Sequence, residues 1–142
     1  MIQECIKTSE DGGPYSRALK IGDFIYISAQ VPDLIIGEST YSQTLQCFEK
    51  IEAVLAACDI SLKYILKTTA FLADLKDLPE VDKAYTEKLS EPYPARSTVS
   101  VKELPAGAKV VIEAFAMDTR ALEVLCAKEN GCCTEKECSF DG

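Results

Sequence analysis

Alternation of apolar with polar or small residues predicts the strands in the first half of the chain. Residues Phe24 to Val31 are rich in aromatic and β-branched side chains, and Tyr64 to Asp74 have a similar character. Weaker strand patterns lie at Ile2 to Lys7 and at Tyr15 to Leu19, separated by the turn sequence Asp11-Gly12-Gly13-Pro14. We therefore expect one or two short N-terminal strands before the two stronger ones.

Two segments repeat apolar residues at three- and four-residue steps, which predicts amphipathic helices. The first runs from Thr40 to about Cys58 and opens with a capping-box pattern of Thr40 and Gln43. The second runs from Leu78 to about Leu89, with Asp77 as its capping residue. Asp82 lies beside the apolar stripe of this second helix, so it is either a rim carboxylate or a polar group offered to a pocket.

Residues 92 to 117 contain two further strand patterns around a turn. The first opens on Arg96, and its period of two places Arg96, Thr98, Ser100 and Lys102 on one face. A guanidinium beside hydroxyl groups can grip a carboxylate through two parallel hydrogen bonds, although an edge arginine in a surface ion pair has the same pattern. The second strand carries Glu113 within an apolar run.

The order strand, strand, helix, strand, helix, strand, strand predicts an α+β fold with both helices on one face of a sheet. We expect Val99, Val101, Val110 and Ile112 to face the helices, and Val111, Phe115 and Met117 to face away. Two helices cannot cover both faces, and an uncovered apolar face is an interaction surface. The pattern therefore predicts a homo-oligomer.

Composition narrows the possible functions of this 142-residue chain. The net charge of −8 opposes nucleic-acid binding, and the absence of histidine excludes a Ser-His-Asp triad, a Cys-His pair and a histidine-bound metal. No apolar run of about twenty residues predicts a membrane span. The N-terminus has no signal-peptide pattern, so a cytoplasmic protein with reduced cysteines is expected.

The last segment, residues 119 to 142, differs in composition from the domain at residues 1 to 118. It lacks a Cys-x-x-Cys pair, and adjacent cysteines chelate poorly, so a flexible reduced tail is expected instead of a metal site. Ala121 to Lys128 fit a helical turn or two. The four cysteines of this tail are Cys126, Cys132, Cys133 and Cys138.

Several short motifs together resemble the Rid family, the reactive-intermediate (enamine/imine) deaminases also called the YjgF family. The resemblance covers about residues 2 to 118 and leaves the tail outside. The motifs, in order, are Gly13-Pro14-Tyr15-Ser16, residues 26 to 32, residues 67 to 75, Pro94-Ala95-Arg96-Ser97, Leu104-Pro105 and Ile112-Glu113-Ala114.

The resemblance implies a chorismate-mutase-like α+β fold, also called YjgF/L-PSP-like, and a homotrimer with pockets at the subunit interfaces. Family members hydrolyse small 2-imino acids, such as 2-iminobutanoate and 2-iminopropanoate, to 2-oxo acids and ammonia without a metal or cofactor. Some members are described as endoribonucleases or translation inhibitors. The implied partners of this chain are therefore a small 2-imino or 2-oxo acid and its own copies. Composition separately predicts no membrane partner, and the negative charge opposes a nucleic-acid partner.

Matching family positions imply roles for individual residues. Arg96 would hold the substrate carboxylate, while Asp82 and Thr98 stand where active deaminases carry an asparagine and often a cysteine. The implied catalytic residues are Arg96, Thr98 and Glu113, and the implied binding residues are Tyr15, Ser28, Ala29, Asp82 and Arg96.

One position departs from the family pattern. Active imine deaminases carry a glutamate two residues before the position of Glu113, and this chain has Val111 there. Valine cannot orient or deprotonate water, and Glu113 lies about 7 Å further along the strand. Asp82 is another conceivable substitute, but it would place negative charge near the ligand carboxylate. Three functions therefore stay open: a weakened imine deaminase, a non-catalytic trimeric binder of small 2-oxo or amino acids, and an RNA-directed protein, which the charge opposes.

Overall fold

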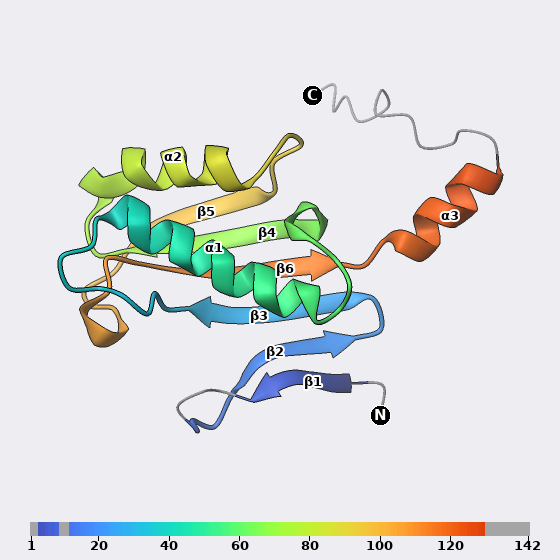
Figure 1. Ribbon diagram of the computed structural model, residues 1–142, viewed down its shortest axis with the longest axis horizontal. Coiled ribbons are helices and arrows are strands. Elements are labelled where there is room, and N and C mark those ends of the chain that lie inside the picture. Colours follow the sequence, from blue (N-terminus) through green and yellow to red (C-terminus); the bar gives the residue numbers. More distant parts are fainter. Residues whose placement is uncertain (1–2, 9–11, 130–142) are drawn as a thin grey trace.

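A six-stranded mixed sheet forms the centre of the protein. The computed structural model describes residues 3–8 and 12–129 (Figure 1). The strand order is β1-β2-β3-β6-β4-β5, and every neighbouring pair is antiparallel except the parallel pair β4 and β5. The strands are β1 Gln3–Thr8, β2 Ser16–Ile21, β3 Phe24–Gln30, β4 Ile65–Leu72, β5 Ala95–Ser100 and β6 Val110–Met117.

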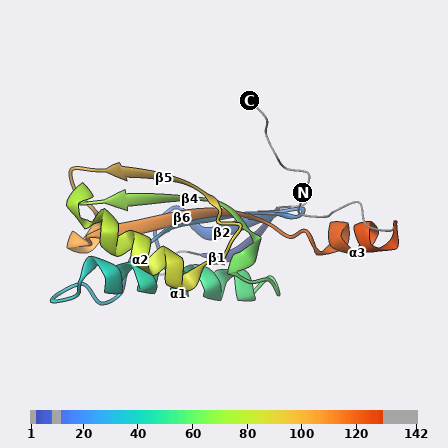
Figure 2. The same cartoon turned by 90° about the horizontal axis from the view of Figure 1, so that it is seen from above.

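Two helices, α1 Thr40–Ala56 and α2 Leu78–Lys88, pack against each other and cover one face of this sheet (Figure 2). The predicted α+β class and the placement of both helices on one face are confirmed. The expected element order was one strand short, because two strands precede β3 and all three lie before α1.

The face beneath the helices forms the core. Phe48 and Leu55 of α1 pack with Ile25 of β3 and Ile112 of β6, and all four side chains are fully buried. The ring of Phe48 meets Tyr85 of α2 edge-on, with 4.8 Å between ring centroids. Each such side chain contributes about 1.5–3 kcal/mol on burial. This core holds the sheet as a fixed support for side chains on its other face.

The helix starts differ from the expected capping pattern. Ser39 is the capping residue of α1, and its hydroxyl accepts a hydrogen bond from the backbone N–H of Ser42 at 3.0 Å. The prediction of Thr40 was wrong by one residue, because the Thr40 hydroxyl instead donates to Asp77 at 2.8 Å. Asp77 precedes α2 as expected but makes no side-chain capping bond to that helix. Thr40 and Asp77 thus tie together the starts of both helices.

The register of β5 corrects the expected orientation of one valine. Arg96 and Thr98 pair with Thr68 and Ala70 of β4, so they point toward the helix side of the sheet. Val99 pairs with Phe71 and therefore faces away from the helices, against expectation. The predicted outward direction of Val111, Phe115 and Met117, and the inward direction of Val110 and Ile112, is confirmed by their alternation along β6.

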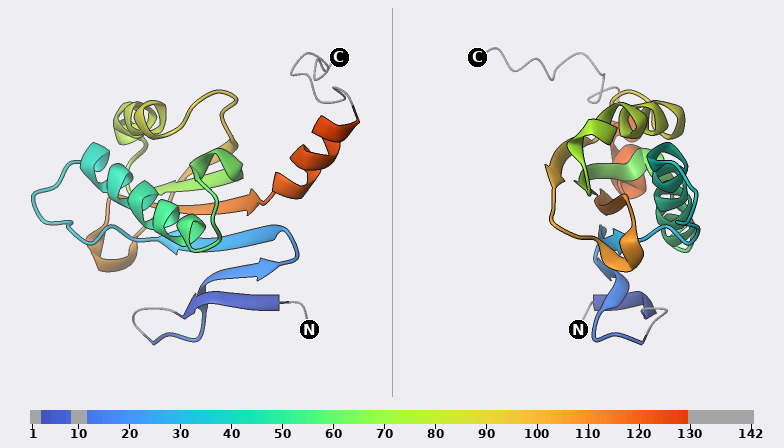
Figure 3. Two further views of the ribbon diagram at one scale, coloured as in Figure 1. Left: turned by 45° about the vertical axis from the view of Figure 1, so that its right-hand side comes forward. Right: turned by 90° about the vertical axis from the view of Figure 1, so that its left-hand side faces the viewer.

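The helix expected at Ala121 to Lys128 is present as α3 Arg120–Lys128, which continues from β6 beyond the end of the sheet (Figure 3). The predicted flexible remainder of the tail, with Cys132, Cys133 and Cys138, lies outside the described residues. None of the helices in the described part of the chain has the length and apolar character needed to cross a membrane.

Candidate functional site

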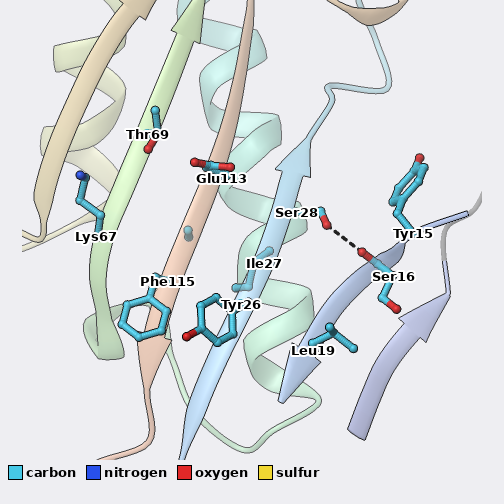
Figure 4. A pocket seen from close by; sticks show the side chains of 11 residues that line it. Tyr15, Ser16, Leu19, Tyr26, Ile27, Ser28, Lys67, Thr69, Glu113 and Phe115 are labelled. Carbon is cyan, nitrogen blue, oxygen red and sulfur yellow. Dashed lines mark hydrogen bonds between the residues drawn. The ribbon is translucent and has the colours of Figure 1, made fainter. Parts of the chain in front are cut away.

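A pocket of about 600 Å³ lies on the sheet face that the helices leave uncovered (Figure 4). We call it the open-face pocket. Its floor follows from strand pairing, because Thr69 of β4 is opposite Glu113 of β6, and Lys67 is opposite Phe115. The lining residues are Tyr15, Ser16, Leu19, Tyr26, Ile27, Ser28, Lys67, Thr69, Glu113, Ala114 and Phe115.

A β-bulge positions the hydroxyl groups at one side of this pocket. The pairing of β3 with β6 shifts between Ile27 and Gln30, and the Ser28 hydroxyl donates to the backbone carbonyl of Ser16 at 2.7 Å. The Gln30 side chain donates to the carbonyl of Ser28 at 2.7 Å and accepts from Arg17 Nε at 3.1 Å. These bonds fix the bulge that carries Ser28 beside the strand with Glu113.

Two groups of opposite charge on the pocket floor are available to a ligand. The side chains of Glu113 and Lys67 make no hydrogen bond or ion pair with any other described residue. Glu113 is exposed and points into the open space, whereas Val111 is only 4% exposed and does not line the pocket. The carboxylate offered by this pocket is therefore that of Glu113.

A second, smaller pocket of about 230 Å³ lies at the edge of the sheet between β5 and α2. We call it the edge pocket. Arg96 Nη1 lies 2.7 Å from Asp82 Oδ1, and its guanidinium carbon lies 4.7 Å from the centre of the Tyr85 ring. Such stacking orients the guanidinium plane. The lining residues are Asp82, Tyr85, Thr86, Tyr93, Pro94 and Arg96.

Tyr85 is held in place under this arginine. Its hydroxyl shares a hydrogen bond of 2.8 Å with the hydroxyl of buried Thr68. Burial raises the pKa of Tyr85 to about 12, although the Thr68 hydrogen bond and the Arg96 charge act in the opposite direction. The ring is therefore neutral at physiological pH and serves as a rigid support for Arg96.

The residues implied by the motifs separate into two groups. Tyr15, Ser28 and Glu113 line the open-face pocket, while Asp82 and Arg96 line the edge pocket. The exposed Ala29 and half-buried Thr98 line neither of these two pockets. Arg96 and Glu113 point to opposite sides of the sheet, so one protomer does not bring them together.

Among the polar residues of the open-face pocket, sequence reasoning missed Lys67 and Thr69 of β4. Their signal is the alternation of Lys67, Thr69 and Phe71 on one side of β4, the side that does not enter the core. Cys47 of α1 is fully buried. Burial raises its thiol pKa to about 12, and its Sγ donates to the carbonyl of Gln30 at 3.3 Å, so it is no nucleophile at neutral pH.

Metal binding has no support in the described part of the chain, where no group of three or more Cys, Asp or Glu side chains is placed to hold an ion. Cys132, Cys133 and Cys138 lie outside it.

Comparison with known proteins agrees with the fold and the motifs. A relative from Sinorhizobium fredii, RutC family protein y4sK, is 43% identical over 107 residues, which cover 72% of this chain and 85% of that protein. A Dermatophagoides farinae protein named 2-iminobutanoate/2-iminopropanoate deaminase is 32% identical over 111 residues, covering 74% of this chain and 86% of the relative.

Solved structures show the same fold. The crystal structure of RidA from the Antarctic bacterium Psychrobacter sp. PAMC 21119 matches with a TM-score of 0.72 at 35% identity, covering 83% of this chain and 99% of that one. The family model described as Endoribonuclease L-PSP matches residues 6–118, which include every strand from β2 to β6 and both covering helices. The chain therefore belongs to the endoribonuclease L-PSP family, the family of the Rid (YjgF) proteins.

Proposed function

We propose that this protein is a homotrimeric deaminase that hydrolyses small 2-imino acids, such as 2-iminobutanoate and 2-iminopropanoate, to 2-oxo acids and ammonia. Family membership and the name of the Dermatophagoides farinae relative support the reaction class. The observation that carries the proposal is the division of the site, with a carboxylate in the open-face pocket and a carboxylate-binding arginine on the edge strand.

A homotrimer would unite these two halves. The open face exposes large apolar side chains, including Tyr26 at 52% and Val99 at 42%, which a second copy of the chain can cover. β5 is an edge strand, so Arg96 lies at the margin of the sheet. If the edge pocket of one protomer meets the open-face pocket of its neighbour, Arg96 and Glu113 face the same ligand from two sides.

The chemistry assigned to the joined site needs no metal or cofactor. Arg96 holds the substrate carboxylate, which places the C=N carbon next to the open-face pocket. Glu113 takes a proton from a water molecule as the water oxygen bonds to that carbon. Glu113 passes this proton to nitrogen and then carries the remaining hydroxyl proton there as well. The C–N bond breaks, ammonia leaves, and the oxygen becomes the carbonyl of the 2-oxo acid. The Ser28 hydroxyl, which already donates to the Ser16 carbonyl, can accept a hydrogen bond from the water or the substrate nitrogen, and Tyr15 lines the same pocket.

The test is ammonia release from 2-iminobutanoate generated in a coupled assay, with the spontaneous rate subtracted. Removing a positioned base or anchor lowers the rate by about a hundredfold or more, so Glu113→Gln and Arg96→Ala should both be strongly impaired. Glu103→Gln, a loss of the same charge at an exposed position outside both pockets, is the control. A wild-type protein that gives only the spontaneous rate overturns the proposal.

A second candidate function is binding of small 2-oxo or amino acids without turnover. The specific observation in its favour is Val111, whose buried apolar side chain stands where active family members carry the water-activating glutamate. This candidate predicts saturable binding of 2-oxobutanoate together with no acceleration of imine hydrolysis. Detectable turnover that depends on Glu113 would remove it.

An RNA-directed role has less support. The matching family model carries the description Endoribonuclease, but the net charge of −8 opposes contacts with a phosphate backbone. Nuclease activity that persists through purification and disappears in Arg96→Ala would favour this role.

A cytoplasmic location also remains a prediction, to be checked by localising the tagged full-length chain.

A further inference from the structure

The ion pair in the edge pocket restricts which acids Arg96 can bind. Asp82 contacts Arg96 through one guanidinium nitrogen, and the Arg96 side chain makes no other hydrogen bond or ion pair within the described residues. The remaining N–H groups of the guanidinium can therefore hold a ligand carboxylate while Asp82 stays in place. The arginine side chain is 27% exposed and that of Asp82 is 52% exposed, so a small molecule can reach both.

A purely anionic ligand fits this pair poorly. Arg96 and Asp82 together are neutral, so an added carboxylate would lie beside a second carboxylate without a compensating cation. A ligand with a cationic nitrogen on the carbon next to its carboxylate offsets that repulsion, because each of its charges meets an opposite one. The ring of Tyr93, which also lines the pocket, offers a further surface that attracts cations.

The size of the pocket limits the ligand further. About 230 Å³ is below the usual range of about 300–1,000 Å³ for pockets that bind drug-sized molecules. The space therefore suits a compact acid of a few carbon atoms. Tyr85, Tyr93 and Pro94 supply the apolar walls for a short side chain.

We propose that Asp82 makes the edge pocket selective for small zwitterions, namely 2-amino acids and protonated 2-imino acids, over 2-oxo acids. The carboxylate binds Arg96 and the ammonium or iminium nitrogen binds Asp82. This rests on the proposed function for the role of Arg96 as carboxylate anchor. Hydrolysis removes the cationic nitrogen and leaves an anion beside Asp82, so the same residue that selects the substrate promotes release of the product.

Binding measurements test this selectivity without turnover. The full-length protein is titrated with 2-aminobutanoate and with 2-oxobutanoate, and dissociation constants are obtained by calorimetry or NMR. A half-exposed charge pair changes affinity by about fivefold, so the wild type should bind the amino acid about fivefold more tightly than the oxo acid. Asp82→Asn, which keeps the side-chain shape, should lose this preference by binding the oxo acid more tightly and the amino acid more weakly.

Glu52→Gln is the matched control, because it removes one negative charge from an exposed position on α1 outside the edge pocket. It should keep the wild-type preference. Equal affinities in the wild type, an unchanged preference in a folded Asp82→Asn variant, or no binding of either ligand at millimolar concentration overturns the proposal. Circular dichroism establishes that each variant is folded.

The same variants separate this inference from the proposed function. A zwitterion preference in a protein without deaminase activity removes the catalytic proposal and leaves the role of Asp82. An active deaminase with no such preference removes the role of Asp82 alone.

Discussion

The two faces of the sheet differ in how their polar groups are used. On the helix-covered side, the hydroxyl of Thr68 bonds to Tyr85, and the Asp118 carboxylate accepts from Arg120 Nη2 at 2.8 Å. On the open side, Glu113 and Lys67 have no such partner among the residues described. No buried side-chain polar atom of the described chain lacks a hydrogen bond.

This difference separates groups that maintain the fold from groups available for function. A buried polar group without a partner costs about 1–3 kcal/mol, which explains why the covered face tolerates only satisfied ones. The open face has no such constraint until a ligand or another copy of the chain covers it. Its unsatisfied charges and exposed aromatic rings are therefore the positions where substitution should change function or assembly more than folding.

The largest expected effect follows from placing a charge on the open face. If this face is buried between protomers, Tyr26→Glu leaves an unpaired carboxylate in each interface, at a cost of several kcal/mol per site. We expect sedimentation velocity to show a trimer for the wild type and monomers for this variant. Glu52→Gln should remain a trimer. A wild-type protein that sediments as a monomer contradicts the proposed assembly.

On the covered face, Ile112→Ala should lower the free energy of unfolding by about 2–5 kcal/mol, because the fully buried side chain leaves a cavity. Val99→Ala on β5 removes an apolar side chain of the open face that is 42% exposed, and should cost much less in the protomer. Urea denaturation measures the free energy of unfolding of both variants, and dissociation of the oligomer is followed as a separate step. Equal losses from both variants would contradict the distinction between the faces.

The sequence predicted only in part which residues face the helices and which lie on the open face. Alternation along β6 was enough to separate Ile112 from Val111, because both belong to one continuous strand. Alternation could not show which way Val99 points. The facing of the β5 side chains depends on the register of β5 with β4, where Val99 pairs with Phe71, 28 positions away in the chain. The identity of Ser39 as the cap of α1 was missed for a local reason, because Thr40 has equally suitable chemistry.

The candidate site was harder to predict than the fold. The motifs pointed to Arg96 and Glu113, both of which line pockets, but period-two reasoning within each strand could not show that they point to opposite sides of the sheet. Lys67 and Thr69 were missed because a lysine and a threonine at alternating strand positions are equally typical of a solvated edge. Only the interior position of β4, between β6 and β5, distinguishes the two cases.

The next effect concerns the apolar residue beside the open-face pocket. Val111→Glu would put a carboxylate where active family members carry the water-activating glutamate, so we expect imine hydrolysis to accelerate by about a hundredfold. Because Val111 is nearly buried, the same change should lower the melting temperature. Val111→Gln is the control for size and polarity, and it should be destabilised without the gain in rate. Equal rates of imine hydrolysis in the two variants would contradict the idea that a carboxylate at position 111 activates water.

The smallest expected effect is on stability at low pH, where the carboxylates of Asp118 and Glu113 should behave differently. Asp118 follows β6 on the covered side, and hydrogen bonds from Arg120 are the main reason why its pKa is lower than the ordinary value. Arg120 also donates to the carbonyls of Cys58 and Asp59, so the pair joins the start of α3 to the turn after α1. We expect Asp118→Asn to cost about 1 kcal/mol at neutral pH.

The sign of its pH dependence follows from the lowered pKa. The folded protein binds a proton at Asp118 less readily than the unfolded chain does, so the stabilisation is present above the ordinary carboxyl pKa of about 3.9 and is lost as the pH falls through the lower folded value. The difference in melting temperature between wild type and Asp118→Asn should therefore shrink below about pH 4. Glu113→Gln, which removes a carboxylate without a partner in the described chain, should differ little from wild type across this range. A Glu113 variant with the same acid-dependent loss as Asp118→Asn would mean that the open-face carboxylate also serves the fold.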